Sequence, residues 1–146
     1  MLSDVPVPVD AVRAVVRLSR LFERSLDGLS LAQYRVLAQI AAGDERASRI
    51  ARRLALGKPA VSATVESLRQ RGLLVRGGLD EDRRVTPLSL TPQGRSVLDA
   101  AERVMAEALG EVLAHTPDSD AAGTVLLQLG DALEQILSAR ARRQDR

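Results

Sequence analysis

The sequence predicts a mainly α-helical fold of the α+β class, with one small β-hairpin. Apolar residues recur at the spacing of helix faces along most of the 146 residues. Two short helical stretches are separated by a turn that contains Gly57. Two short strand-like runs then flank the fully charged segment 80–84. Together these patterns predict a helix-turn-helix followed by a hairpin, which is a winged helix.

Length and composition limit the class of protein. The length suits one folding unit, so we treat residues 1–146 as a single domain. The sequence has no cysteine, which excludes disulfides and thiolate metal sites. No segment has the roughly 18 to 20 consecutive apolar residues of a membrane span, and the N-terminus lacks the pattern of a signal peptide. We therefore expect a soluble, cytoplasmic protein that does not associate with membranes.

Positive charge is concentrated in the middle of the chain. Residues 44–91 hold ten basic and six acidic side chains, a net charge of +4, whereas residues 1–43 have a net charge of +1 and residues 92–146 of −3. This distribution is expected where only the middle segment meets phosphate groups. A solvated charged surface gives the same distribution, so charge alone leaves nucleic-acid binding open.

Two helices are predicted before the basic segment. Apolar residues at helical spacing mark the first one from Val9 to Leu26. A capping box formed by Ser30 and Gln33 marks the start of a second helix, which Gly43 ends. The expected buried stripe of this second helix is Leu31, Tyr34, Leu37, Ala38 and Ala41.

The helix-turn-helix follows within residues 45–74, and Gly72 ends its second helix. Leu56 and Gly57 interrupt the apolar pattern of its first helix. Pro59 suits the first turn of its second helix, because the N–H that proline lacks is not needed there. The residues expected to point inward are Ile50, Ala51 and Leu54 in the first helix, and Val61, Val65 and Leu68 in the second.

A hairpin and two long helices complete the chain. Residues 73–77 and 86–90 are the predicted strands. Thr91 is the expected cap of a helix that runs to about Ala114, and Thr116 with the proline after it repeats this start signal for a last helix.

The helices at the two ends of the chain, within residues 9–28 and 92–143, are apolar over broad faces. We expect them to be buried against a second copy in an intertwined homodimer lobe, with residues 30–91 forming the winged helix-turn-helix lobe. One compact bundle within a single chain is the alternative.

Three stretches of the chain, residues 29–41, 50–76 and 82–94, resemble the MarR family of bacterial regulators in their order and spacing. The most specific match is the signature across the hairpin, which falls on Asp82, Arg84, Leu90, Thr91 and Gly94. The resemblance implies a homodimeric transcription factor, usually a repressor, that binds a palindromic operator. Such regulators often release the operator when a small aromatic or acidic effector binds. One departure is Gly57, where the family often has a serine-type helix cap.

The second helix of the motif is expected to present its N-terminal half to base edges in the major groove of double-stranded DNA. Its outer side chains can exchange hydrogen bonds with bases or contact a thymine methyl. The alternative for each is an exposed residue without a partner. The candidate base contacts are Lys58, Pro59, Ser62, Ala63, Thr64 and Ser67, and the candidate phosphate contacts are Arg49, Arg52 and Arg69.

The resemblance implies two further sets of residues. At the hairpin tip, Asp82, Arg83 and Arg84 are candidate DNA contacts, with Asp82 holding the Arg84 guanidinium by a charge-assisted hydrogen bond before it meets the minor groove. Family ligands usually sit between the two lobes, and arginine suits a carboxylate. The candidate ligand contacts are Arg13, Arg17 and Tyr34, within a wider set that includes Arg20, Arg24 and Arg35. A solvated helix surface is the alternative for these arginines.

No catalytic or metal site can be assembled from the sequence, and no cofactor is expected. His115 is the single histidine, and no cysteine is available to build a metal site or a nucleophile relay with it. We therefore do not expect an enzyme. The alternative to a DNA-binding regulator is a winged-helix module that binds another protein. The basic middle segment favours DNA.

Overall fold

A computed structural model describes residues 5–43, 46–77 and 87–144 of the chain. This described part is mainly helical and holds one antiparallel sheet of two strands. The predicted fold class is therefore confirmed. In chain order the elements are α1 (Val9–Ser25), α2 (Leu31–Ala41), α3 (Ala47–Leu54), α4 (Lys58–Gln70), β1 (Leu74–Arg76), β2 (Leu88–Leu90), α5 (Pro92–Ala114) and α6 (Ser119–Gln144).

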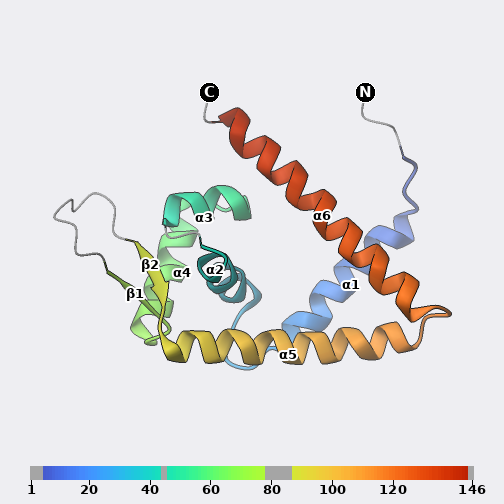
Figure 1. The fold of residues 1–146 in the computed structure, drawn as a ribbon, viewed down its shortest axis with the longest axis horizontal. Helices are drawn as coiled ribbons and strands as arrows, with labels where there is room; N and C mark the ends of the chain where they lie inside the picture. The colour runs from blue at the N-terminus through green and yellow to red at the C-terminus, as the bar shows by residue number, and fades with distance from the viewer. Residues whose placement is uncertain (1–4, 44–45, 78–86, 145–146) are drawn as a thin grey trace.

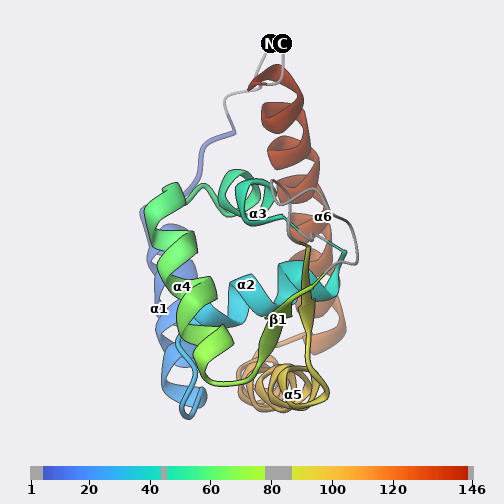
Figure 2. The same cartoon turned by 90° about the vertical axis from the view of Figure 1, so that its left-hand side faces the viewer.

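The elements form a small lobe and a set of long helices that extend from it (Figure 1). The lobe consists of α2, α3, α4 and the two strands. Helix α5 leads away from the lobe, and α1 packs against it. Helix α6 then turns back and contacts both α5 and α3. Figure 2, turned by 90°, shows α4 and the strands side by side at the near end of the molecule, with α6 behind them.

Helix α2 lies at the centre of the lobe. It contacts α3, α4, α5 and β2, and its residues Val36, Leu37 and Ile40 are buried. The stripe predicted for this helix included Leu37 but missed Val36 and Ile40, while Tyr34 is only half-buried. A single stripe describes a helix packed on one side, and it fails here because neighbouring elements cover α2 from several directions.

The helix-turn-helix forms as predicted, because the six residues expected to point inward are all buried. The left-handed position of the turn is not at its glycine. Ala55 adopts the left-handed conformation, with φ of 51°, whereas Gly57 has φ of −63°, which any residue can adopt. Ala55 is the only non-glycine residue with positive φ in the described part of the chain. The backbone N–H of Leu56 donates to the carbonyl of Ala51 at 3.0 Å and closes the end of α3.

The hairpin strands pair in antiparallel register. Leu74 lies opposite Leu90, Val75 opposite Ser89, and Arg76 opposite Leu88. The predicted strands therefore form over three residues each. The connecting segment 78–86 lies outside the described residues.

The junction between β2 and α5 is fixed to the junction between α4 and β1. The Thr91 hydroxyl accepts from the Gly94 N–H at 2.9 Å, as a helix cap, and donates to the Gly72 carbonyl at 2.6 Å. Gly94 is buried directly against the backbone of Leu73. Thr91 therefore caps the start of α5 and also holds this helix to the end of the helix-turn-helix.

The start of α6 differs from the prediction. Thr116 was expected to cap this helix, but its hydroxyl donates to the Leu113 carbonyl at the end of α5, at 2.7 Å. Asp118 takes the capping position instead, and its carboxylate accepts from the Ala121 N–H at 2.9 Å. The Leu113 carbonyl thus accepts from both the backbone N–H and the hydroxyl of Thr116, and the next suitable side chain caps the following helix.

The outer helices leave much apolar surface uncovered. In α1, all of whose residues are described, none is buried. The exposed apolar residues on α1 and α6 include Val12, Val16, Leu129, Leu133 and Ile136. These helices are therefore not packed into one compact bundle within the chain. Within the described residues, every helix is too short or too polar to span a membrane.

Candidate nucleic-acid interface

The N-terminal half of α4 packs against the core with its inner face, and its outer face is exposed to solvent. Val61 and Val65 pack into the core. Lys58, Pro59, Ser62 and Ala63 are all exposed. No side chain caps the helix start at Gly57, so its first N–H groups are not satisfied by a cap. The structure therefore presents four of the six predicted base contacts on one accessible surface.

The other two predicted base contacts are turned toward their own chain. Thr64 is half-buried, and its hydroxyl donates to the Ala60 carbonyl at 2.9 Å. Ser67 is half-buried, and its hydroxyl oxygen accepts from Gln33 Nε2 at 3.4 Å. Base contact by either residue stays a prediction, and it requires these side chains to give up or share their present hydrogen bonds.

Gln33 links the start of α2 to the end of α4, a role beyond its predicted part in the capping box. Its Oε1 accepts from the Ser30 N–H at 3.0 Å, while Ser30 Oγ accepts from the Gln33 N–H at 3.1 Å, which confirms the capping box. The same Oε1 also accepts from Arg71 Nη1 at 3.3 Å. Together with the Ser67 contact, these bonds orient α4 relative to α2. The capping-box pattern located Gln33 in the sequence but gave no sign of its partners on α4.

Glu66 and Arg69 form a two-bond ion pair on α4. Arg69 Nε donates to Glu66 Oε2 at 3.0 Å, and Arg69 Nη2 donates to Glu66 Oε1 at 2.7 Å. Gln70 Nε2 donates to the same Oε1 at 3.1 Å. Hydrogen bonding from Arg69 lowers the pKa of the Glu66 carboxyl from 4.5 to about 2, and the pair raises the pKa of Arg69. Arg69, a predicted phosphate contact, is thus engaged by a carboxylate in the protein without DNA.

We expect this pair to respond to acid. Because the pKa of Glu66 is depressed, the pair's contribution to stability is present above about pH 4.5 and is lost as the pH falls toward 2. At pH 3.5, NMR of the side-chain carboxyl carbon should find Glu66 ionised in the wild type and largely protonated in Arg69→Gln. The control Arg71→Gln removes a nearby arginine that bonds Gln33 instead, and it should leave Glu66 ionised. A protonated Glu66 in the wild type at pH 3.5 contradicts the expectation.

The predicted phosphate contacts on α3 border a cavity. Arg49 and Arg52 are exposed, and both line a space between α3 and α6 that Arg53 also lines. Arg53 Nη1 donates to Glu134 Oε1 on α6 at 2.7 Å. Asp82, Arg83 and Arg84, the predicted hairpin-tip contacts, lie outside the described residues.

The predicted ligand contacts occupy two different environments. Arg13 is exposed on α1 and pairs with Asp10 at 3.0 Å, and Arg17 is also exposed. Tyr34 is half-buried, and burial is the first cause that raises its pKa, followed by the charge of Glu102 and a hydrogen bond to it. None of the three lines the cavity between α3 and α6, although Arg35 of the wider predicted set does.

His115 lies at the C-terminal end of α5, as expected. Its Nδ1 is 2.8 Å from the Glu111 carbonyl oxygen one turn earlier. Among the described residues, no three histidine, aspartate or glutamate side chains gather in a way that could hold a metal ion.

The chain is similar to known proteins. The pattern of the MarR family matches residues 27–85. The HTH-type transcriptional repressor MdtR of Bacillus subtilis (strain 168) is 31% identical over 114 residues, which span 75% of this chain and 74% of that protein.

Solved structures with the same fold include two of CouR. The structure of CouR from Rhodococcus jostii RHA1 bound to p-coumaroyl-CoA has a TM-score of 0.71 and 25% identity, and the match covers 94% of this chain and 94% of that chain. The structure of the transcriptional repressor CouR bound to a 23-mer DNA duplex has a TM-score of 0.71 and 28% identity, and the match covers 84% of this chain and 89% of that chain.

Proposed function

The chain belongs to the MarR family of transcription regulators, and from this premise we propose that it is a homodimeric repressor that binds a palindromic operator and leaves it when a small molecule binds. The members of this family are regulators of transcription and not enzymes. The observation that carries the proposal is the accessible N-terminal half of α4, which projects from a lobe like that of a repressor solved on DNA.

The proposed DNA interface has three parts. The outer face of α4 reads base edges in the major groove, with Lys58 and Ser62 as its principal polar side chains. Arg49 and Arg52 on α3 contact phosphates and fix the position of the protein on the duplex. Arg84 at the hairpin tip, oriented by Asp82, reaches the minor groove or its phosphates. Residues 30–91 therefore form the DNA-binding lobe.

The proposed dimer is supported by the uncovered apolar surface of the outer helices. Val12 on α1 is 54% exposed and Leu133 on α6 is 55% exposed. Exposed apolar side chains on successive turns of one helix, as at Leu129, Leu133 and Ile136 of α6, mark an interaction site. In the proposed dimer, residues 9–28 and 92–143 of the two copies pack against each other and cover this apolar surface. A two-fold dimer then places its two copies of α4 in successive major grooves, about 10 bp apart, so the operator is an inverted repeat.

The proposed response to a small molecule is the most general part of the proposal. It is supported by the related structure of CouR, which was solved with p-coumaroyl-CoA. In this chain an aromatic or acidic effector would bind between the lobes near Tyr34, with Arg13 and Arg17 as candidate contacts. A regulator of this kind works in the cytoplasm, where its operator is.

DNA binding is expected to weaken steeply with salt. Each phosphate that the dimer neutralises releases counterions, so the logarithm of the affinity falls linearly with the logarithm of salt concentration, with a slope of about −0.9 per phosphate contact. Fluorescence anisotropy with DNA from upstream of the protein's own gene measures this slope between about 50 and 200 mM salt. For several phosphate contacts, the affinity for DNA should fall by about tenfold or more over this range.

A matched pair of variants tests the interface. Lys58→Gln should weaken binding and reduce the steepness of the salt dependence, because each dimer loses two basic side chains at the start of α4. Arg103→Gln removes an exposed arginine from α5 and should leave both quantities unchanged. Failure of the wild type to bind this DNA at low salt, together with capture of a protein partner by α4, would favour the interaction-module alternative.

A further inference from the structure

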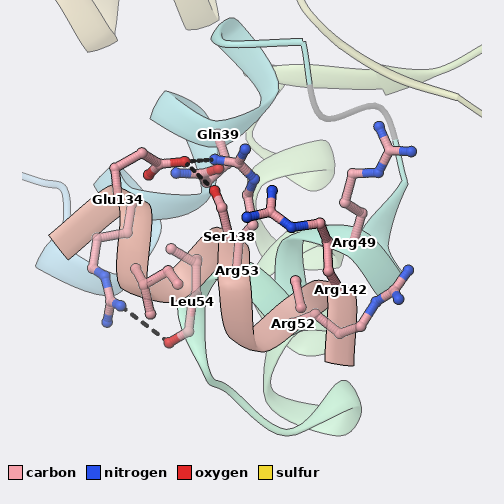
Figure 3. A pocket seen from close by; sticks show the side chains of 11 residues that line it. Gln39, Arg49, Arg52, Arg53, Leu54, Glu134, Ser138 and Arg142 are labelled. Carbon is pink, nitrogen blue, oxygen red and sulfur yellow. Dashed lines mark hydrogen bonds and ion pairs between the residues drawn. The ribbon is translucent and has the colours of Figure 1, made fainter. Parts of the chain in front are cut away.

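A cavity of about 350 Å³ lies between α3 and the C-terminal part of α6, with α2 forming a third wall (Figure 3). Figure 3 shows Arg49, Arg52 and Arg53 extending from α3, and Glu134, Ser138 and Arg142 from α6. The volume is at the lower end of the range of about 300–1,000 Å³ that is usual for ligand sites, so the cavity suits a small molecule.

The lining of this cavity is strongly basic. It contains five arginines, Arg35, Arg49, Arg52, Arg53 and Arg142, and among the described residues that line it the one carboxylate is Glu134. Each guanidinium has five N–H donors in a planar fork, so it can bind an oxyanion while keeping another partner. The walls therefore favour a ligand with several negative oxygens.

Hydrogen bonds within the fold hold Arg53 and Arg35 in place. Arg53 Nη1 donates to Glu134 Oε1 at 2.7 Å, and Ser138 Oγ donates to the same oxygen at 3.3 Å. Arg35 Nη2 donates to the carbonyl of Leu54, at the end of α3, at 3.1 Å. These bonds connect α2, α3 and α6 around the cavity. Leu54, Leu137 and Ala141 add apolar surface to the lining.

One polar atom in the wall is not satisfied. Gln39 lines the cavity, and its Oε1 is buried without a hydrogen-bond partner among the described residues. Buried acceptors are normally paired.

We infer that this cavity binds a small organic or inorganic anion with at least two carboxylate or phosphate groups, bridging the arginines of α3 to Arg142 of α6. The predicted ligand contacts Arg13, Arg17 and Tyr34 do not line this cavity, although Arg35 of the wider predicted set does. Its regulatory consequence rests on the proposed function. Arg49 and Arg52 are candidate phosphate contacts, so an anion that engages them competes with DNA for the same guanidinium groups.

Binding is tested on the protein without DNA. Isothermal titration calorimetry with citrate, with pyrophosphate and with uncharged glycerol, at matched ionic strength, should detect binding of at least one anion and none of glycerol. The better of the two anions distinguishes a carboxylate site from a phosphate site. Arg142→Gln should weaken binding by about tenfold or more, because one strong charge-assisted contact is lost. Arg143→Gln removes an exposed neighbour on α6 that does not line the cavity. It should change the affinity by less than roughly twofold, which is the precision of the method.

A second variant should change the affinity in the opposite direction. Glu134→Gln removes the carboxylate that now occupies Arg53, so the anion should bind several times more tightly. Asp131→Asn removes the same charge from an exposed position on α6 outside the cavity lining and should have no comparable effect. The site is refuted if neither anion binds, if Arg143→Gln weakens binding as much as Arg142→Gln, or if Glu134→Gln fails to tighten it.

The link to DNA is measured separately. The bound anion should lower the affinity for DNA in the wild type and not in Arg142→Gln, again at constant ionic strength. An anion that binds without changing DNA affinity refutes the competition but leaves the site. A protein that binds the anion but not DNA refutes the proposed function and leaves the site intact.

Discussion

Gly94→Ala is expected to destabilise the protein by about 3 kcal/mol or more, a large part of the roughly 5–15 kcal/mol that stabilises a small domain. The residue is buried in the first turn of α5. An alanine Cβ built there would overlap the Leu73 carbonyl oxygen and lie 2.8 Å from the carbonyl carbon. Both atoms belong to the backbone, so no side chain can rotate away. The overlap is relieved only by moving α5 away from the junction of α4 and β1.

Gly110→Ala, in the same helix, is the matched control. A Cβ at Gly110 meets nothing within 4 Å, and alanine is the better residue in a helix interior. This variant should gain about 0.5–1 kcal/mol. Urea denaturation followed by circular dichroism measures both changes. A Gly94→Ala protein as stable as the Gly110→Ala protein would show that the close approach at Leu73 is not required.

Leu133→Glu is expected to convert the proposed dimer into a monomer and to reduce operator affinity by about 10²–10⁴-fold, because the second half-site is then bound independently. Leu133 is 55% exposed on α6 and lies on the same face as Leu129 and Ile136, which are also exposed. A charge at the centre of this face would be buried without a partner in the dimer, which costs far more than the loss of one apolar contact.

Gln135→Glu also introduces a glutamate on α6, but away from this apolar face. It should leave the dimer and its DNA affinity intact. Light scattering coupled to size-exclusion chromatography measures the mass of each variant, and anisotropy measures DNA binding. Circular dichroism should show that the Leu133→Glu monomer remains helical. A monomeric wild type, or a Leu133→Glu dimer that binds DNA normally, contradicts the proposed interface.

Local signals in the sequence predicted most of the elements. The Ser30–Gln33 capping box and the Thr91 cap each join residues three apart, and both form with the expected hydrogen bonds. The inward residues of the helix-turn-helix are buried as expected. The prediction for the start of α6 failed because two side chains there could cap the helix, and Asp118, not Thr116, does so.

The candidate interface was predicted less completely than the fold. The sequence placed Lys58 and Ser62 on an exposed helix face, and the structure agrees. It could not indicate that Ser67 contacts Gln33, because these residues are far apart in the chain and meet only when α2 packs on α4. Exposure and base contact are also different properties, and the base contacts remain predictions.

The sequence by itself determined the helical class and the position of the helix-turn-helix and hairpin. These features depend on residue periodicity and on contacts between residues that are close in the sequence, so they do not depend on how the helices pack together. Only the tertiary structure decided that Gly94 lies against the Leu73 backbone, that Arg53 meets Glu134, and that five arginines surround one cavity. The reason is that such pairings depend on the relative placement of α3, α5 and α6, which packing of the whole chain sets.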